Sequence, residues 1–166
     1  MNKLIRRFGA VFGMAVLCSG SALADVTVTE PTGGQNISAD RAADSTNGPA
    51  FTPLGNIVIT EGAATDFANG SGLTLILTPP PGWQFKAGSG NVLFTSGRNL
   101  SAVSITVAAD NATVTFTVSG APLLDTLIIS NLQVQALSGV TSTVAGVFHV
   151  IAQHPGDGRE IGRAHG

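Results

Sequence analysis

The sequence predicts an all-β protein, a single antiparallel β-sandwich of about eight or nine strands with an immunoglobulin-like or cohesin-like arrangement. The clearest observation is the stretch Ser101 to Val118, in which apolar residues alternate with serine or threonine on both sides of Asp110-Asn111. A period of two on each side of a polar turn is typical of a β-hairpin. Each strand then has an apolar face and a hydroxyl-lined face, so a second sheet must cover the apolar side.

The other expected strands follow in chain order, separated by turn residues. Residues 25–30 alternate and form the expected first strand, and a connection rich in Gly, Pro, Asn and Ser follows over 31–54. So long a connection is unusual in a compact domain. It either crosses between the sheets with a short strand or helical turn at 37–43, or leaves residues 25–54 loosely attached. The remaining strands are expected at 56–61, 72–78, 83–85, 91–95, 101–118 (the hairpin), 124–136 and 143–152.

The N-terminus has the pattern of a signal peptide over residues 1–24. Basic Lys3, Arg6 and Arg7 precede an apolar run, and Ala22-Leu23-Ala24 is a small-residue cleavage site. The expected products are a mature domain over 25–153 and a flexible, glycine-rich tail over 154–166. The expected location is therefore extracellular or at the cell surface, with the periplasm as the alternative.

Charge and hydropathy narrow the set of partners. The expected mature chain has five Lys or Arg against ten Asp or Glu and contains no cysteine. Nucleic acid and anionic lipid are poor partners for so acidic a surface. Beyond the leader no apolar run approaches the roughly 20 residues of a membrane-spanning helix, so we expect no integral membrane span. Without disulfides, burial of a core must hold the domain together.

Four segments in this order resemble the repeat-type β-sandwich modules found in tandem in large bacterial surface and extracellular proteins. They are G-G-Q-N-I-S-A-D from Gly33, G-N-I-V-I-T-E-G-A-A from Gly55, L-T-P-P-P-G-W-Q-F from Leu77 and L-I-I-S-N-L-Q-V from Leu127. The resemblance implies a non-catalytic spacer, adhesive unit or fibre building block, and it brings no catalytic residues. Here the module is a single copy, which cannot form a stalk unless copies join one another.

Residues with catalytic or metal-binding chemistry do not form a recognisable motif. The three histidines are His149, His154 and His165, and no G-x-S-x-G sequence occurs. We therefore expect no enzymatic activity and no cofactor. The acidic residues in or near loops are candidate calcium ligands, although the D-x-D-x-D-G spacing is missing and solvated turn carboxylates are the alternative. These candidates are Asp40, Asp44, Glu61 and Asp66.

Two further features suggest interaction surfaces. Trp83 and Phe85 follow a proline-rich turn and would form a carbohydrate platform if exposed, or fill the core if buried. Val26 and Val28 precede the long connection, so the first strand has the form of a donor strand that completes the sheet of another copy. The alternative is that this strand pairs within its own chain.

The sequence thus predicts a secreted, non-catalytic structural or interaction protein of the bacterial cell surface or extracellular matrix. The expected partners are other copies of itself or surface proteins. One form of this hypothesis is a self-assembling fibre subunit that exchanges its N-terminal strand. The alternative is a carbohydrate-binding module that binds polysaccharide through exposed aromatic side chains.

Overall fold

The computed structural model describes residues 26–33, 37–139, 149–153 and 160–165. These residues form three antiparallel sheets and one 3-10 turn, η1 (Ala39–Arg41). No helix in these ranges is long and apolar enough to cross a membrane. The expectation of an all-β antiparallel sandwich is confirmed, while the leader at 1–24 lies outside the described residues.

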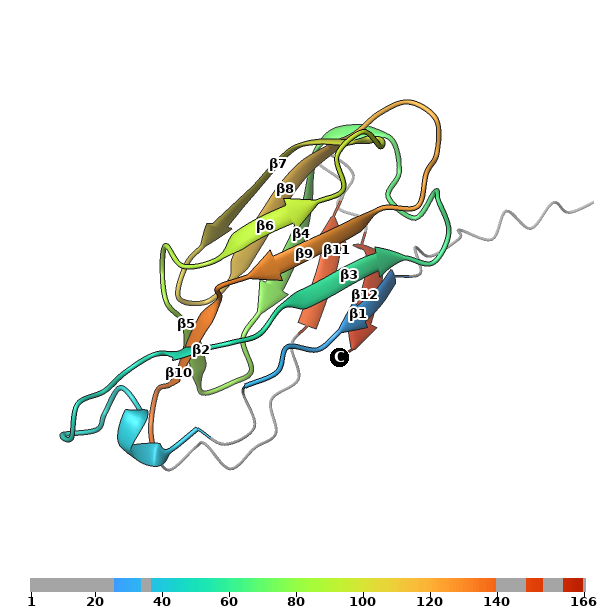
Figure 1. The fold of residues 1–166 in the computed structure, drawn as a ribbon. Coiled ribbons are helices and arrows are strands. Elements are labelled where there is room, and N and C mark those ends of the chain that lie inside the picture. The colour runs from blue at the N-terminus through green and yellow to red at the C-terminus, as the bar shows by residue number, and fades with distance from the viewer. Residues whose placement is uncertain (1–25, 34–36, 140–148, 154–159, 166) are drawn as a thin grey trace, which may run out of the picture.

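Two of the sheets face each other and form the layers of the sandwich (Figure 1). We call the first sheet A, with the strand order β1-β3-β9-β6, and the second sheet C, with the order β12-β11-β4-β8-β7. The strands of sheet A are β1 (Val26–Thr29), β3 (Ile57–Glu61), β9 (Thr126–Ser130) and β6 (Asn91–Phe94). Those of sheet C are β12 (Glu160–His165), β11 (His149–Gln153), β4 (Gly70–Thr78), β8 (Ala112–Val118) and β7 (Leu100–Val107).

A short third sheet, sheet B, continues one end of the sandwich. Its strands are β2 (Thr52–Pro53), β10 (Gln133–Ala136) and β5 (Trp83–Phe85), in the order β2-β10-β5.

The core lies between sheets A and C and is built by the alternation that the sequence shows. In β8 every second residue is buried, and in β3 the same alternation buries the first, third and fifth residues. Pleated strands place alternate side chains on opposite faces, so the threonines between the buried residues of β8 point away from the core. The largest fully buried apolar side chains are Phe85, Ile57, Ile59, Leu73, Leu75, Leu77, Leu127, Ile129, Leu132 and Val114.

The structure confirms the hairpin expected over 101–118 but divides the long strand expected over 124–136 into two. The hairpin is confirmed, because β7 and β8 pair antiparallel from Val107↔Ala112 outward. The single strand expected over 124–136 is wrong, because the chain leaves sheet A after β9 and enters sheet B as β10. The break lies at Asn131, whose φ of +56° is left-handed. Asparagine tolerates this region better than most residues, which ends the ladder there.

The connection between β1 and β3 is anchored, which differs from the loose attachment considered for residues 25–54. The main-chain N–H of Ala43 donates to Ala136 at 2.8 Å, and Leu54 N–H donates to Leu132 O at 2.8 Å. Gly55 N–H also donates to Thr32 O at 2.8 Å, close behind β1. The helical turn expected near 37–43 is present as η1. Backbone hydrogen bonding thus orders a segment that has little apolar patterning.

The chain end also differs from the expectation, because residues 160–165 pair with β11 as strand β12 instead of forming a flexible tail. Main-chain pairing does not require an apolar pattern, so the glycine-rich sequence did not reveal this strand. Residues 143–148 of the last strand expected over 143–152 lie outside the described residues.

Candidate functional site

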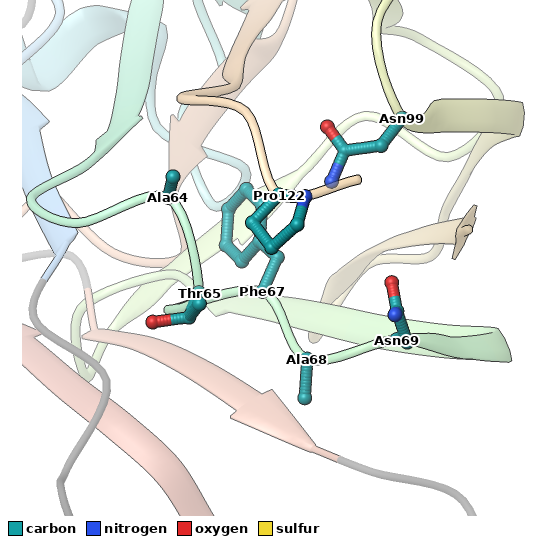
Figure 2. A pocket seen from close by; sticks show the side chains of 7 residues that line it. All are labelled: Ala64, Thr65, Phe67, Ala68, Asn69, Asn99 and Pro122. Carbon is teal, nitrogen blue, oxygen red and sulfur yellow. The ribbon is translucent and has the colours of Figure 1, made fainter. Parts of the chain in front are cut away.

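Three loops meet at the end of the sandwich where β3 and β8 finish. They are the β3–β4 loop (62–69), the β6–β7 connection (95–99) and the β8–β9 loop (119–125). We call this region the loop end. Figure 2 shows that Phe67, Asn99 and Pro122, one from each loop, lie around a common pocket. Long-range strand pairing brings the loops together, since they are far apart in the sequence.

Glu61 connects two of these loops from inside the molecule. Its side chain lies on the same inner face of β3 as those of Ile57 and Ile59, and it is only 3% exposed. Its Oε1 accepts the main-chain N–H of Phe67 at 2.5 Å, and its Oε2 accepts the N–H of Asp125 at 2.8 Å. Charge-assisted bonds of this kind are stronger than neutral ones. Glu61 therefore joins the β3–β4 loop and the β8–β9 loop to the end of β3.

Asp125 is a buried carboxylate whose oxygens have no hydrogen-bond partner in the described part of the chain. It is 1% exposed, and both Oδ1 and Oδ2 are unpartnered. Burial raises the pKa of Asp125, and the positive charge of Arg98 lowers it in part. Burial also raises the pKa of Glu61, against the two main-chain N–H groups, and the carboxylates of Asp125 and Asp66 add to the rise. Removing a carboxylate from water disfavours its charged form, which explains both directions.

The pocket at the loop end is small and shallow. Its volume is about 60 Å³, which admits a few water molecules, whereas small-molecule sites usually occupy roughly 300–1,000 Å³. Asn99 is 6% exposed and its Oδ1 has no partner among the described residues. An unpartnered acceptor beside a pocket of this size fits a bound water molecule or one small donor group. The lining residues are Ala64, Thr65, Phe67, Ala68, Asn69, Asn99 and Pro122.

The four candidate calcium ligands do not gather at one place. Asp66 Oδ2 accepts the N–H of Ala63 at 2.7 Å within the β3–β4 loop, and Glu61 is used as described above. Asp40 belongs to η1, and Asp44 Oδ1 accepts the N–H of Gly139 at 3.0 Å. Hydrogen bonds from Ser138 and Gly139 lower the pKa of Asp44. The described residues contain no group of three or more Asp, Glu, His or Cys side chains that could hold a metal ion.

The two aromatic residues considered for a carbohydrate platform lie in β5. Phe85 is 1% exposed and belongs to the core, so it cannot present a ring to a sugar. Trp83 is half-buried and packs against the same core. Side chains two positions apart on a strand lie on the same face of its sheet. Trp83 and Phe85 are such a pair, and the face they share is the one that packs against the core. This leaves the platform without its second ring and favours packing for both residues.

Val26 and Val28, the candidate donor-strand residues, pair within their own chain in the structure. Strand β1 runs antiparallel to β3, with Val26 opposite Glu61 and Val28 opposite Ile59. Both valines are half-buried and pack against the core, while Thr27 and Thr29 between them are exposed. β1 is the outermost strand of sheet A, so one of its main-chain edges faces away from β3.

The outer faces of both sheets are uncharged over the strands whose side chains the structure describes. From β1 to β10 the one charged strand residue is Glu61, and it is buried. On sheet C the outer face of β4, β8 and β7 consists mainly of hydroxyl side chains, with Thr74 opposite Thr115 and Thr115 opposite Ser104. On sheet A the outer face has rows of threonine and aliphatic residues. Over strands β1 to β10 the outer faces are therefore neutral.

Sequence reasoning missed Asp125, Asn99 and the pocket. Asp125 could have been found from its spacing, because it lies two residues before Leu127 and four before Ile129. This spacing places its carboxylate on the inner face with those two buried residues. Glu61 had the same signal through Ile57 and Ile59 but was considered only as a calcium ligand. The pocket had no sequence signal, since it depends on three loops meeting in space.

Comparisons with protein-family models, with curated proteins and with solved structures found no match to this chain.

Proposed function

We propose that this chain is a secreted, non-catalytic structural or interaction protein of the cell surface or extracellular matrix, and that it associates with copies of itself. The observation that carries the proposal is the absence of exposed charge on the described strands β1 to β10. Exposed charges of mixed sign and charged edge strands are the usual means by which sheet proteins avoid joining one another. Strands β1 to β10 lack both, and among the described strands the edge strand β12 of sheet C carries Glu160 and Arg163.

The distribution of acidic residues supports self-association through the sheets. The whole chain has a formal net charge of −2. Asp40, Asp66 and Asp110 lie in loops or turns and not on the sheet faces. Arg41, Lys86 and Arg98 lie outside the strands as well, so two copies that approach end to end would bring loop charges of both signs together. Two copies that approach through strands β1 to β10 would bring no exposed charge together. Neutral, hydroxyl-rich faces are also unsuited to nucleic acid, which is bound by basic surfaces.

The N-terminal strand supplies a route from association to a fibre. β1 contributes four residues, and in the described structure all its ladder partners belong to β3. The same strand from a neighbouring copy would find the same half-buried positions for Val26 and Val28. The exchange would hinge at Glu30 and Pro31, because Thr32 is held by Gly55. A head-to-tail exchange of this kind that does not close on itself gives a filament.

The experiment is electron microscopy and sedimentation of the exported protein, alongside the same protein without residues 25–30. We expect filaments that the deletion abolishes. Val28→Asp should do the same, because it places a charge at an inward position. Ser101→Asp, at an exposed position of β7, is the matched control and should still assemble. An exported protein that stays monomeric at high concentration would contradict the proposal.

A further inference from the structure

An aliphatic row crosses the outer face of sheet A. In the ladder, Val58 lies opposite Ile128, and Ile128 lies opposite Leu93. Directly opposed residues on one face have Cβ atoms about 4.5–5.5 Å apart, so the three side chains are neighbours. We call Val58, Ile128 and Leu93 the aliphatic row.

The aliphatic row points away from the core. In β3 and β9 the residues on either side of Val58 and Ile128 are buried, whereas these two are only half-buried. Leu93 is 59% exposed, the largest value among the exposed large apolar side chains of the described chain. Figure 1 shows sheet A as one outer layer of the molecule, with the labelled strands of sheet C behind it. The row is therefore apolar surface that no described element covers.

Neutral side chains flank the aliphatic row on both sides. Thr60 Oγ1 and Thr126 Oγ1 are 3.3 Å apart in the adjacent row, which Thr27 extends onto β1. On the other side Asn91 lies opposite Ser130. The face thus combines an apolar centre with a polar, uncharged rim, which is the usual arrangement of a protein interface.

We propose that this face is the contact surface between two copies of the chain, which pack aliphatic row against aliphatic row. The inference rests on the self-association proposed above and adds a second contact beside the exchange of β1, one that joins copies through their sheet faces. A second copy fits because both surfaces are then uncharged, so an acidic chain meets itself where no carboxylate faces another. The pairing is isologous, with each copy's Leu93 buried by the other's row.

The size of the face sets the strength of the contact. Four strands about 4.8 Å apart and four or five residues of about 3.4 Å each give a footprint on the order of 300 Å². Stable interfaces bury about 800 Å² per partner. A single pair of faces therefore gives a weak dimer. Two filaments joined internally by exchange of β1 would pair many such faces at once, which strengthens the contact through effective concentration.

The test compares Leu93→Glu with Ser104→Glu by sedimentation of the exported protein over a concentration series up to about 1 mM, the range in which so small an interface associates. Both residues are exposed and lie on edge strands, Leu93 on β6 of sheet A and Ser104 on β7 of sheet C. We expect Leu93→Glu to weaken self-association about tenfold or more, because it removes buried apolar surface and opposes like charges. Ser104→Glu should leave it unchanged. Circular dichroism confirms the fold of both variants.

Other results of the same experiment would show whether the contact face alone is wrong or self-association as a whole is wrong. If the parent protein associates and Leu93→Glu associates equally well, or if Ser104→Glu is the variant that dissociates, the face is wrong while self-association stands. If the parent protein is monomeric throughout, both proposals fail. If it is monomeric and binds phosphatidylcholine vesicles in a Leu93-dependent way, the occupant of the face is a lipid surface and not a second copy.

Discussion

Glu61 and Asp125 are joined by two hydrogen bonds, one main chain to main chain and one through a buried carboxylate. Glu61 N–H donates to Asp125 O at 3.1 Å, and Asp125 N–H donates to Glu61 Oε2 at 2.8 Å. The arrangement continues the pairing of β3 with β9 past the last strand pair and into the loop end. It also brings two carboxylates into one low-dielectric region, where Arg98 offsets part of the charge of Asp125.

This pair predicts that stability falls as the pH rises. Burial raises the pKa of both groups in the folded protein, so the folded state holds their protons more tightly than the unfolded state does. The free energy of unfolding then decreases as the pH rises from the unfolded pKa, about 4, through the raised folded pKa. The lowered pKa of Asp44 acts in the opposite direction and below this window.

Urea unfolding between pH 4 and pH 7 checks this prediction when the parent protein is compared with Asp125→Asn. The variant cannot ionise at this position, so we expect a shallower pH dependence and about 1 kcal/mol more stability at pH 7. Asp110→Asn, in the exposed turn of the β7–β8 hairpin, is the control and should follow the parent. Identical pH slopes for the parent and Asp125→Asn would refute the role of the pair.

Glu61→Ala tests the connecting role of the carboxylate. The change leaves the buried N–H groups of Phe67 and Asp125 without their acceptor and opens a cavity at the end of β3. We expect a loss of about 2–4 kcal/mol in the free energy of unfolding, measured in urea. Glu30→Ala removes an exposed glutamate and should change stability by less than about 0.5 kcal/mol. A loss below 1 kcal/mol for Glu61→Ala would show that the two N–H groups find other partners.

The alternation of buried and outward-facing residues in β4 and β8 predicts different stability losses for substitutions on the two faces of sheet C. Leu75 is 0% exposed in the centre of sheet C, and Thr115 lies across from the adjacent residue, Thr74, with its side chain on the outer face. Leu75→Ala should cost about 2–5 kcal/mol, because it removes buried methyl groups and leaves a cavity. Thr115→Ala should cost less than about 1 kcal/mol. Thermal and urea unfolding measure both, and similar costs for the two would contradict the assignment of faces.

The sequence was sufficient for the layers because alternation is a local property of each strand. Val114 and Phe116 alternate with threonines, and this fixes which face is buried before any pairing is known. Sheet membership depends on long-range pairing, which is why Asn131 was not recognised as the point where the chain changes sheets. Strand β12 has no apolar pattern, so only its main-chain pairing with β11 reveals it.

The same distinction applies to the candidate sites. The inward parity of Glu61 and Asp125 can be read from their own strands, but the hydrogen bonds between them need β3 and β9 to be neighbours. The aliphatic row likewise needs the register that places Leu93, Ile128 and Val58 side by side. Phe85 was ambiguous because a strand pattern does not say which of its faces is covered.

Gly90 is required for two separate reasons: its backbone conformation and the lack of space for a side chain. A comparison with Gly97 separates the two contributions to the free energy of unfolding. Its φ is +90°, and a Cβ at this position would lie 3.0 Å from Leu132 Cδ2 and 3.1 Å from Val107 Cγ2. Gly97 has a φ of +80° with nothing within 4 Å of a Cβ. Gly97→Ala should therefore cost about 1–2 kcal/mol from backbone strain alone. Gly90→Ala should cost about 1–3 kcal/mol more, because Leu132 and Val107 are buried and cannot move away freely. Urea unfolding of the two variants gives the difference directly, and equal losses would mean that the core around Leu132 adapts to the extra methyl group.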